Sequence, residues 1–141
     1  MSLQNRFGPA SDVVFRVLFS VVFIIGGMGH FGNSETMLAA LEAAPLGHLA
    51  DLFGPPAMLL SLSGVAMIVG GIALAVGFLA RWAAIGLIFV VIPITVTVHL
   101  GDATHIGHIL KNLALLGGLI HFAARGAGAY SIDARLNNRA G

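Results

Sequence analysis

Four long apolar stretches, separated by shorter polar segments, dominate the hydrophobic pattern of the chain. They cover about residues 13–31, 56–78, 82–100 and 106–124. A helix needs roughly 20 apolar residues to cross the hydrocarbon core of a bilayer, and each stretch is about that long. The pattern therefore predicts an all-α protein, an integral membrane four-helix bundle that forms a single transmembrane domain over residues 1–141.

The segment between the first two stretches also carries a helical pattern. Apolar residues recur at helical spacing on either side of a break near Pro45 and Gly47: Met37, Leu38 and Leu41 before it, and Leu49, Leu52 and Phe53 after it. This spacing is typical of amphipathic helices that lie in the membrane interface. We expect one or two short interfacial helices here, which either cover the mouth of the bundle as a lid or pack on the membrane surface.

The composition supports a location inside the bilayer. Hydrophobic residues make up 57% of the chain and charged residues only 9%, whereas a soluble domain carries about 25% charged residues. With a net charge of +1, the chain offers no basic surface to a polyanion. We therefore expect the lipid bilayer as a partner and no nucleic acid. The chain has no cysteine, which excludes dithiol chemistry and iron–sulfur clusters on its own residues.

The basic residues are distributed unequally between the two ends of the predicted bundle. Six of the seven belong to the N-terminus, the second loop, the C-terminus or the parts of the spans next to them: Arg6, Arg16, Arg81, Arg125, Arg135 and Arg139. In a chain with four spans these regions lie on one side of the membrane. Cytoplasmic segments are enriched in Lys and Arg, so both termini are expected in the cytoplasm and the first and third loops on the outer side.

Two features of the predicted spans bear on their packing. Gly71 and Ala75 are four positions apart, a spacing of small residues that lets helices approach closely in lipid. Pro93 removes a backbone hydrogen bond from the third span, and the hydroxyls of Thr95 and Thr97 are placed to repair it. We expect a kink at this point.

Polar residues gather at the outer ends of three predicted spans. The candidate ligand-binding residues are His30 in the first span, His99 in the third, and His105, His108, Lys111 and Asn112 at the start of the fourth. Polar side chains inside a membrane are costly, and they usually have a partner or a function.

The spacing within the fourth span predicts how some of these residues are directed. His105, His108 and Asn112 occur at i, i+3 and i+7, so they share one face of a helix. Lys111 is long enough to extend to the interface, where we expect it to pair with an acid such as Asp102 or Glu35. Asn112 is too short for this, so we expect it to face the bundle and bond to His30 or His99.

Three interpretations of the cluster remain open. The residues could be no more than the polar ends of helices. They could bind a metal or a haem, with His30, His99 and His108 as weak candidates, although their spacing matches no established metal motif. They could instead bind a quinone, because the two carbonyl oxygens of a quinone ring accept hydrogen bonds from imidazole, lysine and asparagine side chains.

The C-terminal stretch KNLALLGGLIHFAARGAGAYSIDARL, residues 111–136, resembles the closing segment of the DoxX family. In that family a Lys-Asn pair opens the last span, a glycine pair follows, and the chain ends in Gly-x-Gly-x-Tyr-Ser-hydrophobic-Asp. The matching residues are Lys111, Asn112, Gly117, Gly118, Gly126, Gly128, Tyr130, Ser131 and Asp133. Arg16, the GGMGHF segment at the end of the first span, the length and the four-span layout resemble the family as well.

The resemblance implies a multi-pass protein of the bacterial cytoplasmic (inner) membrane. It also implies a link to quinones, because family members are similar to the small membrane subunit of thiosulfate:quinone oxidoreductase. We therefore expect a quinone-linked redox subunit with a polar pocket at the outer membrane face. The alternatives are a non-catalytic accessory or structural subunit of a larger membrane complex and, after that, a haem- or metal-binding membrane protein. No catalytic residue is assigned, so enzyme activity stays open.

The residues of the closing segment also have a predicted structural role. Gly126 and Gly128 are expected to end the fourth span and turn the chain. Ser131 is expected to cap a short surface helix that carries Arg135, and Tyr130 suits the headgroup layer.

Overall fold

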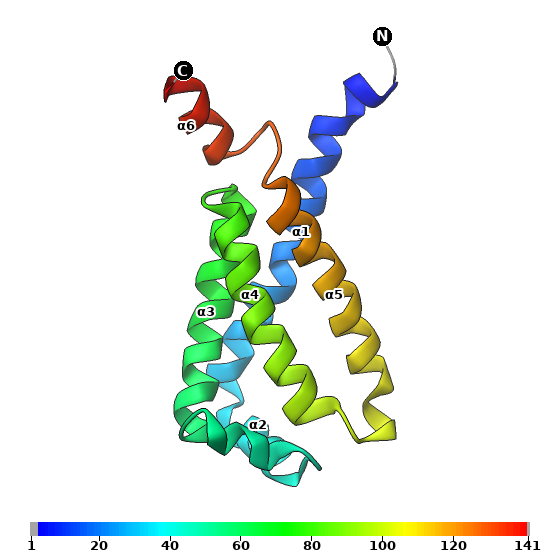
Figure 1. Cartoon of the computed structure of the whole chain (residues 1–141), viewed down its shortest axis with the longest axis vertical. Helices are drawn as coiled ribbons and strands as arrows, with labels where there is room; N and C mark the ends of the chain where they lie inside the picture. The colour runs from blue at the N-terminus through cyan, green and yellow to red at the C-terminus, as the bar shows by residue number, and fades with distance from the viewer. Residues whose placement is uncertain (1–2, 141) are drawn as a thin grey trace.

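A computed structural model gives the fold, with the backbone described for residues 3–140 and the side chains for residues 8–139. Arg6, one of the arginines used to predict the orientation, lies outside the described side chains. Every regular element from residue 3 to residue 140 is a helix. The long ones are α1 (Leu3–Gly32), α3 (Pro56–Val76), α4 (Ala80–Ile94) and α5 (Ile106–Arg125) (Figure 1).

Four helical segments are long and apolar enough to cross a membrane, which confirms the predicted fold class. They are Gly8–Gly32, Pro56–Val76, Ala80–His99 and Ala103–Arg125. The third consists of α4 and a π-helical turn, η2 (Thr95–His99), and the fourth begins with a 3-10 turn, η3 (Ala103–His105), that leads into α5. Both termini lie at one end of the bundle, called here the terminal end (Figure 1).

The opposite end, called here the loop end, carries α2 (Ser34–Ala43), η1 (Gly47–Leu52) and η3. The first two elements are the expected short helices between the first and second spans, and α2 lies across the bundle (Figure 1). Gly47 allows the break between them, because a Cβ at this position would overlap the carbonyl oxygen of Leu41.

Helices α1 and α3 pack closely because glycines lie where their backbones meet. A Cβ added to Gly27 would come within 2.7 Å of the carbonyl oxygen of Gly64, and one added to Gly71 within 2.9 Å of Ile24 Cγ1. The predicted role of Gly71 in close packing is thus confirmed. Gly27 and Gly64 form a second close approach that the small-residue pattern of the second span did not indicate.

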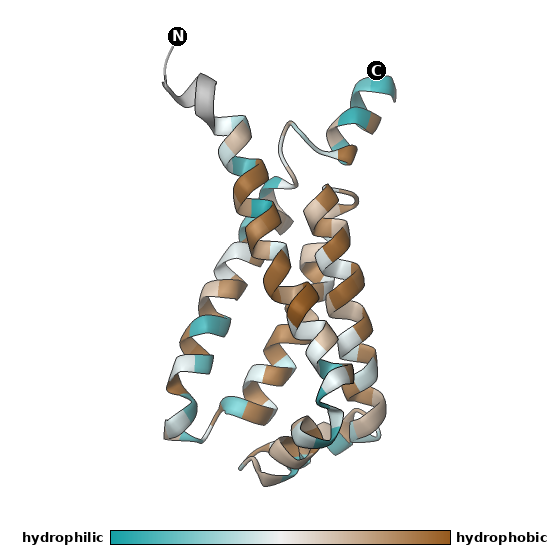
Figure 2. Cartoon of the chain, turned by 180° about the vertical axis from the view of Figure 1, so that it is seen from behind, coloured by the Kyte–Doolittle hydropathy of each residue, from teal (hydrophilic) through white to brown (hydrophobic). Residues whose placement is uncertain are grey.

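Aromatic rings join α1 to α5 in the half of the bundle nearer the terminal end. The ring of Phe122 stacks on Phe15 with centroids 5.1 Å apart, and it lies 5.6 Å from the ring of Phe19. Phe23, Leu119 and Phe122 belong to the buried core. Toward the loop end α1 and α5 diverge (Figure 1). Figure 2 shows hydrophilic positions on the loop-end part of α5 and on α6 (Ile132–Ala140), whereas most of the four spans is hydrophobic.

Arg16 is buried inside the bundle near the terminal end, with only 3% of its surface exposed. Its Nε donates a hydrogen bond to the carbonyl oxygen of Ala75 at 3.1 Å, and Nη2 donates to that of Tyr130 at 2.8 Å. Its Nη1 donates to the carbonyl oxygen of Ala127. One guanidinium therefore ties α1 to the end of α3 and to the segment that follows α5.

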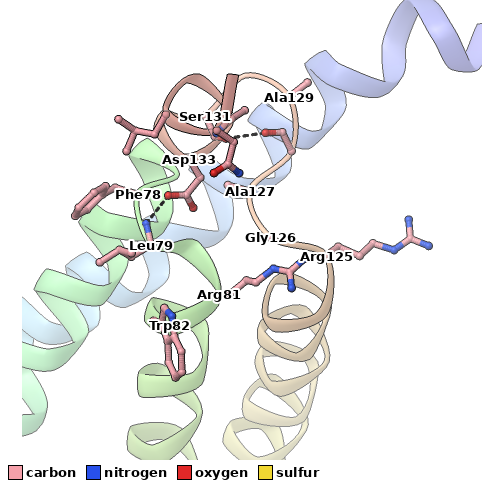
Figure 3. A pocket seen from close by; sticks show the side chains of 14 residues that line it. Phe78, Leu79, Arg81, Trp82, Arg125, Gly126, Ala127, Ala129, Ser131 and Asp133 are labelled. Carbon is pink, nitrogen blue, oxygen red and sulfur yellow. Dashed lines mark hydrogen bonds between the residues drawn. The ribbon is translucent and has the colours of Figure 1, made fainter. Parts of the chain in front are cut away.

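The closing segment folds back onto the terminal end of the bundle. Gly126 and Gly128 adopt positive φ values of 77° and 80°, which confirms that they turn the chain after α5. The backbone N–H of Ala134 donates to Ser131 Oγ at 3.1 Å, so Ser131 caps α6 as predicted. Asp133 has an unpredicted role: its two carboxylate oxygens accept hydrogen bonds from the backbone N–H groups of residues 79 and 80, at the start of α4 (Figure 3).

We predict that Arg16→Met lowers the free energy of unfolding by about 3 kcal/mol, because buried carbonyl groups then lose their donors, at a cost of about 1–3 kcal/mol for each group left unpaired. Unfolding in mixed detergent micelles measures the change. Arg135→Met is the matched control: Arg135 is exposed on α6, so removing the same charge there is expected to change stability by less than about 0.5 kcal/mol. Equal losses in both variants would contradict this role of Arg16.

Candidate functional site

A cavity of about 760 Å³ lies between the helices in the loop-end half of the bundle. It is lined by α1, α3, the third span and α5, and by Met37 and Leu41 of α2. All six residues that the sequence singled out line this one cavity: His30, His99, His105, His108, Lys111 and Asn112. Most of the remaining wall is apolar and includes Phe23, Leu60, Met67, Val90, Ile94 and Leu115. Polar groups from three spans are thus brought together on the wall of one largely apolar cavity.

Three of the histidines form a packed cluster. The rings of His99 and His108 stack with centroids 4.9 Å apart and an interplanar angle of 11°. The ring of His105 stands nearly perpendicular to both, with centroids 5.2 Å from His99 and 5.5 Å from His108. The imidazole group of His105 also lies near the loop end, with Nδ1 3.3 Å from the carbonyl oxygen of Val98. The third loop therefore places the ends of two spans in direct contact.

His30 lies on the wall of the same cavity, but it bonds to α3 and not to the other three histidines. Its Nδ1 is 3.1 Å from the carbonyl oxygen of Leu60 and 2.9 Å from Ser63 Oγ, both on α3. The side chain is 9% exposed. Ser63 also lines the cavity, and the sequence gave no reason to select it, since serines are common in membrane helices. His30 therefore helps to hold α1 against α3, and only its Nε2 atom remains for a ligand.

The π-helical turn after Pro93 determines where His99 lies. The Thr95 hydroxyl donates to the carbonyl oxygen of Val91 at 2.6 Å, and the Thr97 hydroxyl donates to that of Pro93 at 2.9 Å. Both hydroxyls thus bond within the third span beside Pro93, but not to the carbonyl of Phe89, which is the one that loses its backbone donor at this proline. The extra residue in the turn changes the direction of the side chains that follow it, and such turns often occur at functional sites.

Asn112 bonds to a residue that the sequence analysis did not select as its partner. Its Nδ2 donates to Thr95 Oγ1 at 2.9 Å, not to His30 or His99 as predicted. Thr95 can accept because its own proton is already given to the carbonyl of Val91. Asn112 is 6% exposed and joins α5 to the third span. Hydrogen bonds of this kind between membrane helices contribute about 0.6 kcal/mol on average.

Lys111 does not form the ion pair that the sequence predicted. Among the described side chains, the sole ion pair joins His105 Nδ1 to Asp102 Oδ2 at 3.9 Å. Asp102 also accepts hydrogen bonds from the side chain and backbone of Thr104, which lower the pKa of its carboxyl below the usual value. Asp102 is therefore engaged within its own loop. The expected pairing of Lys111 with Asp102 or Glu35 is wrong, and the lysine lines the cavity without a carboxylate partner.

His99 carries a buried atom without a partner. In the part of the chain whose side chains are described, Nδ1 of His99 is the one buried side-chain nitrogen or oxygen that makes no hydrogen bond. Buried polar atoms are almost always paired, by the protein, by water or by a ligand. This atom and the ammonium group of Lys111 provide unused hydrogen-bonding capacity on the part of the cavity wall that the histidine cluster forms, called here the polar end of the cavity.

The geometry does not favour a metal or haem in this cluster. No group of three or more His, Asp or Glu side chains within the described residues could hold a metal ion. Because the lone pairs of imidazole lie in the plane of the ring, two rings that stack face to face do not direct nitrogens at a shared ion. The pair His99 and His108, with an interplanar angle of 11°, is arranged in this way. His30 already uses Nδ1 in contacts with α3.

Comparison with known proteins places this fold in a family. The DoxX family model matches residues 11–100, which include Arg16 and the GGMGHF segment but not the closing segment 111–136. The chain belongs to the DoxX family and is a multi-pass inner membrane protein. Among its relatives is the inner membrane protein YqjF of Escherichia coli (strain K12), 30% identical over 129 residues, which cover 90% of this chain and 92% of the relative. No solved structure matches the chain.

Proposed function

We propose that this DoxX family protein is the quinone-binding membrane subunit of a redox enzyme, and that the cavity at the loop end holds the quinone. One observation carries the proposal: the six polar candidate residues, from three spans, line one largely apolar cavity of about 760 Å³. Sites for small molecules are typically apolar enclosures of about 300–1,000 Å³ that contain a few polar groups to orient the ligand.

The chemistry of the wall suits a molecule with a polar ring and an apolar tail. Lys111 offers a charged donor, and neutral imidazole groups offer one N–H donor and one acceptor nitrogen each. The carbonyl oxygens of a quinone would accept from these donors. Apolar residues such as Met67, Val90 and Leu115 would surround the isoprenoid tail.

Reduction of a quinone to a quinol consumes two electrons and two protons. This chain has no cysteine, so it has no dithiol from which the electrons could come. In the proposal they come from the redox centre of a partner subunit. Lys111 and the imidazole cluster lie at the polar end of the cavity, where they could pass protons from water to the two ring oxygens.

The orientation of the chain is part of the proposal. The arginines of the terminal end, namely Arg81, Arg125, Arg135 and Arg139, favour the cytoplasmic side, so the loop end and the histidine cluster beside it face outward. Because the chain has no cysteine, single cysteines can report on each end. We predict that Glu42→Cys reacts with a membrane-impermeant maleimide in intact cells, and that Asn137→Cys reacts only after the cells are permeabilised. The reverse pattern would overturn the orientation.

Binding of a short-chain quinone to the protein in lipid nanodiscs tests the proposed ligand. Lys111→Met removes a charged hydrogen bond worth about 1.5–3 kcal/mol, so we predict about ten- to hundredfold weaker binding. His108→Phe keeps an aromatic ring in the cluster but removes its nitrogens, and about tenfold weaker binding is expected. His121→Phe is the matched control, because His121 lies on the same helix but does not line the cavity; it should bind like the unmodified protein.

A second experiment, on membranes, separates the redox subunit from a non-catalytic accessory subunit. The variants Asn112→Leu and Lys111→Met are each compared with the unmodified protein. Two quantities are measured: the amount of protein in the membrane and the rate of the quinone-dependent reaction in those membranes. Normal amounts with lost turnover support the proposal. Normal amounts with unimpaired turnover and unchanged quinone binding in both variants would refute it and favour the accessory role.

A further inference from the structure

A second cavity, of about 540 Å³, lies at the terminal end, far along the bundle from the histidine cluster. Its wall is formed by the start of α4, the end of α5, the turn at Gly126 and Gly128, and α6 (Figure 3). None of its lining residues contributes to the first cavity. It is therefore an independent feature of the fold.

Two arginines line this cavity, and neither is paired. Arg81 reaches from the start of α4 toward the turn after α5, where a Cβ on Gly126 would lie 3.5 Å from its Nε (Figure 3). Arg125 starts at the end of α5 and extends away from Arg81, at the outer edge of the cavity (Figure 3). Both side chains are exposed. Within residues 8–139 neither guanidinium makes a hydrogen bond or an ion pair, the single ion pair there being that of His105 and Asp102.

The one carboxylate in the wall is occupied elsewhere. Asp133 accepts hydrogen bonds from the backbone N–H groups of Leu79 at 2.8 Å and Ala80 at 3.0 Å, and so caps α4. A carboxylate held in this way does not leave its cap to pair with either arginine. The cavity thus has uncompensated positive charge at the end of a membrane bundle, where phosphate groups of lipids are abundant.

Large apolar side chains complete the wall. Trp82 is 70% exposed, and Leu79 and Phe78 are 52% and 42% exposed. Trp82 is near the start of α4, and tryptophan is enriched at the interfaces between membrane and water. The wall therefore offers guanidinium groups for an anionic head and apolar surface for the chains attached to it.

From this arrangement we infer that the terminal-end cavity binds a phospholipid with a net anionic headgroup. The forked guanidinium group of Arg81 donates to the phosphate oxygens, and Arg125, at the outer edge of the cavity, adds positive charge that attracts the headgroup. The acyl chains lie along Phe78 and Trp82. The shared chemistry is a phosphate group, which could come from a lipid or from free phosphate in solution, and the test separates the two.

Native mass spectrometry of the purified full-length protein, with phosphatidylglycerol or phosphatidylcholine added, measures which of the two lipids the protein retains more strongly. We expect the unmodified protein to retain phosphatidylglycerol more strongly. In the Arg81→Gln/Arg125→Gln variant its affinity should fall by about thirtyfold, since each arginine near a lipid surface contributes about 1 kcal/mol. The matched control is Arg135→Gln/Arg139→Gln, which removes the same charge from α6 without touching the cavity wall; it should keep the preference.

Three outcomes overturn the inference. The first is no preference of the unmodified protein for phosphatidylglycerol over phosphatidylcholine. The second is an equal loss in both glutamine variants, which assigns the effect to overall charge. The third is displacement of the lipid by inorganic phosphate, which makes this a free-phosphate site. If Arg81→Gln/Arg125→Gln fails to insert, Arg81→Lys/Arg125→Lys decides: weaker binding of phosphatidylglycerol supports the forked contacts, and unchanged binding contradicts them.

Discussion

Hydrocarbon offers no hydrogen-bond partners, so each polar group that the four spanning helices carry must find one inside the protein. Arg16 meets this requirement with three carbonyl groups, one from α3 and two from the segment after α5, and in doing so it holds the closing segment against the bundle. Thr95 and Thr97 meet it within the third span, where Pro93 interrupts the ladder. Asn112 then uses the remaining capacity of Thr95 to join α5 to that span.

The same requirement distinguishes the groups that are bonded within the fold from the groups whose hydrogen-bonding capacity is unused. Nδ1 of His99 is buried and unpaired, and Lys111 lines the cavity without a carboxylate, whereas Asn112 and His30, on the same wall, are bonded to neighbouring helices. The terminal end has a comparable contrast, since all three guanidinium nitrogens of Arg16 donate hydrogen bonds while Arg81 has no partner among the described side chains. Unused hydrogen-bonding capacity is thus located at both ends of the bundle, and the core between them is apolar.

The spans, the short helices between the first two spans and six polar residues of the cavity wall could be selected from the sequence, because hydrophobic length and helical spacing are local properties. The hydrogen-bond and ion-pair partners of the polar residues could not be predicted in this way. Lys111 was expected to reach Asp102, but Thr104 and His105 already engage that carboxylate. Asn112 was expected to bond to a histidine, yet the π-helical turn brings Thr95 within reach. The cap that Asp133 provides joins residues more than fifty positions apart, and no local pattern records such a contact.

The central claim is that the loop-end cavity holds a quinone. Identification of the small molecules that co-purify with the protein tests this claim most directly. The protein is extracted in native nanodiscs, and its bound small molecules are identified by mass spectrometry beside those of Ala66→Trp, which places a bulky ring in the cavity from α3. The account predicts quinone in near-stoichiometric amount with the unmodified protein and its loss from the Ala66→Trp variant. Quinone no more abundant than in the surrounding lipid, or equal in both proteins, would contradict the account.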